Sequence, residues 1–142
     1  MRLHLIRRYK PGETIGRLVL GTKLICIVRE APKECFNGAY SCLSEGLYSL
    51  MPIHTEDKGW MISLGTKGLI LPKSAELNPG SNELIPFSCF NEAKVPMFSR
   101  LAFSKLFERL ELEWANDSVV ELLISGIPVP YSLAKCRSRS RC

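Results

Sequence analysis

The sequence contains no long apolar run. Nowhere do about 18 apolar residues follow one another, so we predict no transmembrane helix. The opening segment, MRLHLIRRYK, lacks the long apolar region and small-residue cleavage site of a secretory signal. We therefore expect a cytoplasmic protein that does not associate with membranes.

Histidine is scarce, and cysteine pairs with metal-ligand spacing are absent. The two histidines, His4 and His54, fall in separate segments, and no Cys-x-x-Cys pair occurs. A structural zinc site needs several cysteine or histidine ligands held at short spacings. We therefore expect neither a metal ion nor a cofactor.

Six cysteines are present, at positions 26, 35, 42, 89, 136 and 142. Without a secretory signal, reduced thiols are the expected state. Cys26 lies in the apolar run LICIV, which predicts a buried small hydrophobic residue. For Cys35 and Cys42 an alternative is a disulfide that closes the loop between them in an oxidising compartment.

Positive charge is concentrated at the C-terminus. The net charge is +5, and the segment KCRSRSRC at 135–142 supplies four of these charges. A nucleic-acid face would combine basic residues with aromatic ones, and this tail has no aromatic residue. We interpret it as a solvated terminus that is dispensable for folding, with a phosphate-binding arm as the alternative, and expect no nucleic-acid partner.

The chain length of 142 residues suits one domain, which we place at 3–126, followed by a C-terminal extension at 127–142. Hydrophobic residues make up 46% and charged residues 23%, which is ordinary globular usage and argues against disorder. Short apolar or β-branched runs predict strands at 3–9, 15–20, 23–28, 46–53, 60–64 and 67–71. The pair Gly21-Thr22 suits a two-residue hairpin turn.

The second half differs in character. Four prolines and no clean period over 72–96 predict a long irregular loop. A helical apolar spacing then predicts one amphipathic helix over 99–114, with Ser99 as N-cap and Phe98 and Phe103 as a hydrophobic staple. A final strand is predicted at 118–124. The fold class is therefore mostly β (α+β), a small β-barrel or sandwich of about seven strands with the helix packed on it.

Several segments follow one another in a recognisable order. RRYKPGETIGRLVL at 7–20 contains Arg-x-Tyr and Thr-Ile-Gly, and Glu-Ala-Pro follows at 30–32. SCLSEGLY at 41–48 is the most specific of the motifs. FSRLAFSKLFERL at 98–110 and VVELLI at 119–124 complete the order.

This order resembles a phage and bacterial family of domains of unknown function that is similar to L,D-transpeptidase catalytic domains. Family members carry Arg-x-Tyr with TIG, then Glu-x-Pro, then Ser-Cys-Ile-Pro-x-Gly-x-Tyr, and finally a serine-containing helix and a closing strand. The resemblance covers positions 3–124 and implies a fold of the L,D-transpeptidase kind with a cysteine–histidine site.

The resemblance assigns that site to two later segments. The family's Ile-His-x-Gly-Asn element aligns with 68–75, so that Pro72 stands where the histidine belongs. The family's Gly-Cys-Ile element aligns with Ser88-Cys89-Phe90, which makes Cys89 the candidate nucleophile. A cysteine attacks as the thiolate, whose formation a neighbouring imidazolium promotes. His54 is the candidate replacement base, provided that the fold brings it against Cys89.

Two functions are compatible with these residues. The first is a non-catalytic binding or interaction domain, a pseudoenzyme whose active site has been lost and whose partner is a protein or a cell-wall-like peptide. The second is a cysteine-dependent acyl transferase or hydrolase acting on peptidoglycan-like peptides. The replacement of the histidine by Pro72 favours the first, and we then expect Cys89 to be a buried or half-buried packing residue. The oligomeric state stays open.

Overall fold

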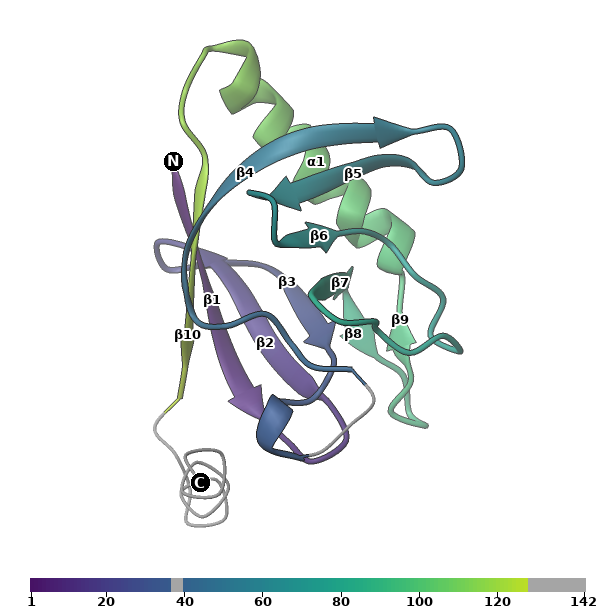
Figure 1. Ribbon diagram of the computed structural model, residues 1–142. Coiled ribbons are helices and arrows are strands. Elements are labelled where there is room, and N and C mark those ends of the chain that lie inside the picture. Colours follow the sequence, from purple (N-terminus) through teal and green to yellow (C-terminus); the bar gives the residue numbers. More distant parts are fainter. Residues whose placement is uncertain (37–39, 128–142) are drawn as a thin grey trace.

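The computed structural model describes residues 1–36 and 40–127. Eight strands close into a barrel in the order β1, β10, β4, β5, β6, β7, β3 and β2 (Figure 1). Their bounds are Arg2–Tyr9 (β1), Thr14–Leu20 (β2), Lys23–Glu30 (β3), Gly46–Thr55 (β4), Gly59–Leu64 (β5), Gly68–Ile70 (β6), Glu83–Phe87 (β7) and Glu121–Gly126 (β10). Outside the barrel lie the 3-10 turn η1 (Glu34–Phe36), a ribbon of β8 (Cys89–Phe90) with β9 (Pro96–Met97), and the helix α1 (Ser99–Ala115). The predicted fold class is confirmed, and the architecture is the barrel.

Alternating burial builds the barrel wall. The buried residues of β1 and β2 fall at every second position: Leu3, Leu5, Arg7, Tyr9, Thr14, Gly16 and Leu18. The predicted two-residue turn is present, because Leu20 pairs with Lys23 and Gly21 has a φ of 62°. A positive φ is readily adopted by glycine, which has no Cβ. The barrel closes where β1 pairs in parallel with β10, from Arg2↔Glu121 to Arg7↔Gly126.

The region predicted as one irregular loop, 72–96, contains a strand of the barrel. In β7 the four residues from Leu84 to Phe87 are all buried, because β3 and β6 flank this strand and α1 packs against it. A strand buried on both faces lacks alternation, so periodicity could not reveal it. Pro86 is tolerated because β6 pairs only with Glu83 and Leu84 of this strand. The barrel therefore has eight strands, where about seven were predicted.

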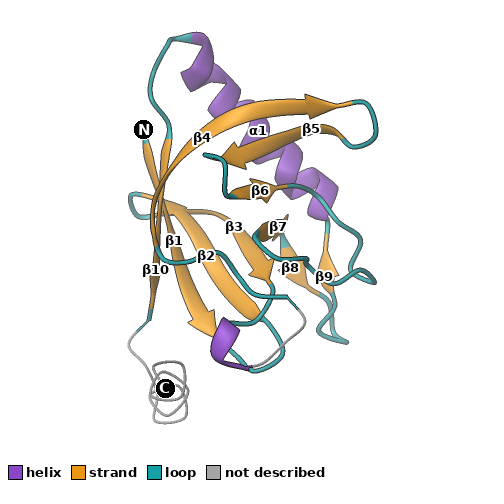
Figure 2. Cartoon of the chain, in the orientation of Figure 1, coloured by secondary structure: helices purple, strands orange, loops and turns teal. Residues whose placement is uncertain are grey.

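The helix α1 matches its predicted range to within one residue. It crosses behind β4, β5 and β6 in Figure 2. Phe103, Leu106 and Leu110 are buried in the main core, and Phe107 and Trp114 pack against that core. Among the described residues, neither α1 nor any other helix is long and apolar enough to cross a membrane.

The predicted start of the helix is wrong in detail. Phe98, and not Ser99, is the N-cap, and it makes no side-chain capping bond. The Oγ of Ser99 instead accepts a hydrogen bond from the backbone N–H of Lys73, at 3.1 Å. Phe98 is 57% exposed, and no ring contact joins it to the buried Phe103 within the described residues, so the predicted staple has no structural support.

The cysteines differ from one another. Cys26 is buried in the core as predicted. Cys42 is a free thiol, whereas Cys35 is disulfide-bonded, so the alternative Cys35–Cys42 bridge is absent and the expected reduced state is wrong for Cys35. The predictions made for the tail at 135–142 lie outside the described residues.

Candidate functional site

Cys89 lies at the surface, on the ribbon that follows the barrel. It is exposed on β8, where it pairs with Met97 of β9. The expectation of a buried or half-buried residue is therefore wrong. The chain leaves the barrel after Phe87, whose ring is fully buried, and the two-residue strand β8 has both of its side chains exposed. Phe90 touches Phe87 edge to face, with ring centroids 4.9 Å apart.

His54 does not meet Cys89. It is exposed on β4, in the hairpin with β5, and packs edge to face on Trp60 at 4.9 Å. Trp60 in turn contacts Phe107 of α1. In Figure 1 this part of the hairpin is separated from β8 by β6 and β7. No hydrogen bond or ion pair joins His54 to Cys89 within residues 1–36 and 40–127, so the Cys89–His54 dyad has no structural support.

A hollow lies beside the ribbon. Its volume is about 390 Å³, and two segments line it, 72–75 and 96–100. The first segment contains Pro72, the position that the resemblance assigns to the catalytic histidine. The second joins β9 to the first residues of α1. Only the first of these segments is one that the resemblance assigns to chemistry, and Cys89 is not part of the lining.

One of the residues that line this hollow is Lys73. Its Nζ donates to Glu83 Oε1 at 2.7 Å and to the backbone oxygen of Asn78 at 3.0 Å. Glu83 Oε1 also accepts a hydrogen bond from the N–H of Gly80. Burial raises the pKa of Glu83, but the hydrogen bonds from Lys73 and Gly80 and the charge of Lys73 outweigh burial and lower it. Lys73 is therefore a structural cation that carries its own carboxylate partner.

The lip of the hollow has an unusual residue, Phe98. Its backbone is left-handed, with φ 64° and ψ 42°, and its ring is 57% exposed. A left-handed conformation is costly for a bulky side chain, and such strain is often found at ligand clamps. Arg100 lines the same hollow, is exposed, and makes no ion pair with the described part of the chain. The lip therefore combines an exposed aromatic ring with an unpaired cation.

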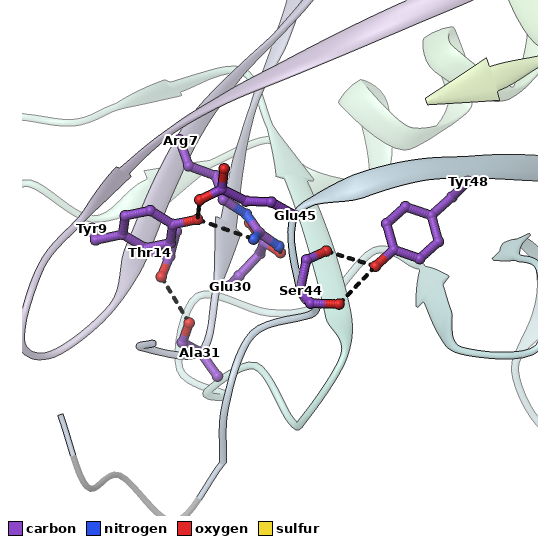
Figure 3. A network of polar contacts seen from close by, with 8 residues as sticks. All are labelled: Arg7, Tyr9, Thr14, Glu30, Ala31, Ser44, Glu45 and Tyr48. Carbon is purple, nitrogen blue, oxygen red and sulfur yellow. Dashed lines mark hydrogen bonds and ion pairs between the residues drawn. The ribbon is translucent and has the colours of Figure 1, made fainter. Parts of the chain in front are cut away.

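A second group of polar residues meets at one end of the barrel, where Arg7, Tyr9 and Glu30 are buried and Glu45 is exposed (Figure 3). Arg7 donates from Nε to Glu30 Oε2 at 2.8 Å and from Nη2 to Glu30 Oε1. Tyr9 accepts a weak hydrogen bond from Arg7 Nη1 and donates to Glu45 Oε2 at 2.6 Å. Glu45 Oε1 also accepts from the N–H of Gly126. We call Arg7, Tyr9, Glu30 and Glu45 the barrel-end network.

The electrostatics of the network keep Arg7 charged, whereas burial raises the pKa of Glu30 although the charge and hydrogen bonds of Arg7 oppose this. Burial lowers the pKa of Arg7, but the charge and hydrogen bonds of Glu30 outweigh burial and raise it. The guanidinium therefore stays protonated. The free thiol of Cys42 lies nearby, and burial raises its pKa although the charge of Arg7 opposes this.

The network consists of residues from the motifs that carry the family resemblance. Arg-x-Tyr supplies Arg7 and Tyr9, Glu-Ala-Pro supplies Glu30, and SCLSEGLY supplies Glu45. In the same motif Tyr48 donates to the backbone oxygen of Ser44 at 2.6 Å. Sequence reasoning identified the motifs and missed their convergence. The signal that could have revealed this convergence is a polar residue of β1 at a position that the alternation places inside the barrel.

Within the described residues, no group of three or more histidine, cysteine, aspartate or glutamate side chains could hold a metal ion. Comparison of the chain with protein-family models, with curated proteins and with solved structures gave no match. The function is therefore inferred from the chemistry of the residues themselves.

Proposed function

We propose that this chain is a non-catalytic binding domain with an L,D-transpeptidase-like fold, and that it holds an acidic, cell-wall-like peptide in the hollow between 72–75 and 96–100. The observation that carries the proposal is Phe98, a strained and exposed aromatic residue at the lip of a cavity of about 390 Å³. An exposed aromatic ring offers a ligand a large apolar contact.

Charge and surroundings support the same ligand. Arg100 lines the hollow and has no carboxylate partner among the described residues, so it is available to a carboxylate of the peptide. Met97 and Pro96 extend the apolar lining next to Phe98. A peptide with apolar side chains and free carboxylates complements both features.

The surroundings of Cys89 favour binding over catalysis. The position assigned to the histidine is Pro72, which has no titratable group. The adjacent Lys73 is engaged by Glu83, so it does not act as a free base. The residue that pairs with Cys89 across the ribbon is Met97, whose thioether cannot act as a base.

The test is a titration of the protein with a tetrapeptide that carries one glutamate and a free C-terminal carboxylate, followed by calorimetry. Phe98→Gly should weaken binding about tenfold or more, as loss of a central aromatic contact does. The same variant should be at least as stable as the native protein, since glycine relieves the left-handed strain. A Phe98→Gly variant that loses binding because it no longer folds would contradict this expectation.

The matched control is Lys94→Gly. Lys94 also has a positive φ, of 60°, and it is exposed in the turn between β8 and β9 without lining the hollow. This variant should bind the peptide as the native protein does. Equal affinity for the native protein and Phe98→Gly, or no binding of the peptide to either, would refute the proposal.

The alternative, a cysteine-dependent acyl transferase or hydrolase, is favoured by one observation: Cys89 is exposed, as a nucleophile must be. It is tested by the rate of iodoacetamide labelling at Cys89 at about pH 6, followed by mass spectrometry, in the folded and the denatured protein. A binding domain should label no faster when folded. Faster labelling in the folded state would establish an activated thiol and the enzymatic function.

A further inference from the structure

A second pocket, of about 410 Å³, is lined in part by the turn between β1 and β2. Three stretches of chain contribute most of its lining: the turn at 11–13, the end of β3 with 31–32, and Asn78 with Pro79. Tyr40 completes it with an aromatic ring that is 56% exposed. None of these residues lines the hollow beside Phe98.

Arg29 is the unusual residue of this pocket. It is on β3 and only 5% exposed. Its Nη2 donates to the backbone oxygens of Ser74 and Leu77, both at 2.8 Å, whereas its buried Nε has no partner. No ion pair to Arg29 is present in the described part of the chain. A buried guanidinium with neutral acceptors alone is costly, so an added carboxylate would stabilise it.

Glu13 supplies the opposite charge on the same pocket. Burial has the larger effect on Arg29 and lowers its pKa. The charge of the Glu13 carboxylate acts in the opposite direction and raises it. The two side chains form no ion pair with each other, although both line the pocket. A cation and a carboxylate therefore line one pocket at a distance from each other, with Pro32, Pro79 and Tyr40 as apolar neighbours.

We propose that this pocket binds a free α-amino acid as the zwitterion. The carboxylate of the ligand pairs with the guanidinium of Arg29, the ammonium group faces Glu13, and an apolar side chain lies against Tyr40 and the prolines. A dianion such as inorganic phosphate is disfavoured because Glu13 lines the same pocket. This site is separate from the proposed peptide-binding hollow and does not depend on it.

The probes are leucine, 4-methylpentanoate, which lacks the amino group, and isoamylamine, which lacks the carboxylate. Binding to the full-length protein is followed by calorimetry and by the NMR shifts of the backbone amides at 11–13. Leucine should bind saturably, 4-methylpentanoate about tenfold more weakly, and isoamylamine not at all. Glu13→Gln should bring leucine and 4-methylpentanoate to equal affinity, since it removes only the partner of the ammonium group.

Glu108→Gln, at an exposed position of α1, is the matched control and should keep the native preference. Arg29→Met should abolish binding of both carboxylates. Arg29 also donates hydrogen bonds to the backbone of Ser74 and Leu77, so Arg29→Met could fail to fold. In that case the preference measured for Glu13→Gln decides between the outcomes. The proposal is overturned if no carboxylate binds the native protein, or if Glu13→Gln and Glu108→Gln show the same preference as the native protein.

Discussion

Glu30 and Arg7 form an ion pair with two hydrogen bonds inside the barrel, where their side chains are 0% and 1% exposed. The pair joins β1 to β3 across the strand β2 that separates them in the barrel order. Tyr9 and Glu45 extend it to the segment before β4 and to the end of β10. The barrel-end network therefore ties together four parts of the wall.

Breaking this pair should be strongly destabilising. Arg7→Met or Glu30→Gln leaves one buried polar group without its partner, which should cost about 3 to 5 kcal/mol of unfolding free energy in urea titrations. The double variant Arg7→Met/Glu30→Met should lose less than either single variant, because no unpaired charge remains. The exposed pair Arg2 and Glu121 is the control, and its single variants should each lose at most about 1 kcal/mol. Equal losses of unfolding free energy at the Arg7–Glu30 and Arg2–Glu121 pairs would contradict the stabilising role assigned to the buried pair.

The hydroxyl of Tyr9 should make stability depend on alkaline pH. Burial is the main cause that raises the pKa of Tyr9, and the hydrogen bond to Glu45 adds to it, against the opposing effect of Arg7. Because the folded pKa lies above the unfolded value near 10, this stabilisation is complete below about pH 10 and is lost as the pH rises towards the folded pKa. Tyr9→Phe should flatten that part of the curve of unfolding free energy against pH. Tyr40→Phe, at an exposed ring, should leave the curve as it is.

Leu110 anchors α1 in the core. Its side chain is fully buried, so Leu110→Ala should cost about 2 to 5 kcal/mol in unfolding free energy. Phe107→Ala should fall towards the lower end of that range, since Phe107 is only partly buried. Leu112, exposed on the same helix, provides the comparison, with a change within about 0.5 kcal/mol. A similarly small loss of unfolding free energy for Leu110→Ala would show that the helix does not pack into the core.

Gly68 stands where β6 passes close to other backbone. An added Cβ would lie 2.9 Å from the backbone oxygen of Asn82 and 3.2 Å from Leu43 Cδ2. Gly68→Ala should therefore cost about 1 to 3 kcal/mol, as measured by urea unfolding. Gly12→Ala, where a Cβ meets nothing within 4 Å, should be neutral or slightly stabilising. Similar values for the two variants would show that β6 can shift to accept the methyl group.

The sequence predicted the elements that form separate apolar or β-branched runs, or whose apolar residues recur at helical spacing. Strands β1 to β6, strand β10 and the helix α1 belong to this group. It did not predict β7, whose burial on both faces depends on α1 and on β3, far away in the chain. The helix cap was missed for a similar reason, since Ser99 is engaged by Lys73 from a distant segment.

The candidate sites were harder to predict from the sequence, because they depend even more on contacts between residues far apart in the chain. The motifs containing Arg7, Glu30 and Glu45 were visible in the sequence, but their meeting at one end of the barrel required the register of several strands. Cys89 was predicted to be buried or half-buried and is exposed, because its exposure depends on where the chain leaves the barrel. Nothing in the local sequence at Phe98 indicates a left-handed backbone.

The parallel pairing of β1 with β10 has a consequence for how the protein is made. Arg2 and Glu121 are neighbours across this seam although 119 positions separate them. On the ribosome β1 emerges early and waits with one edge unpaired until β10 has left the exit tunnel. Contacts so distant in sequence slow folding, and an open strand edge recruits other chains. The barrel therefore cannot close before β10 has been made, and the free edge of β1 is where an incomplete chain would pair with another.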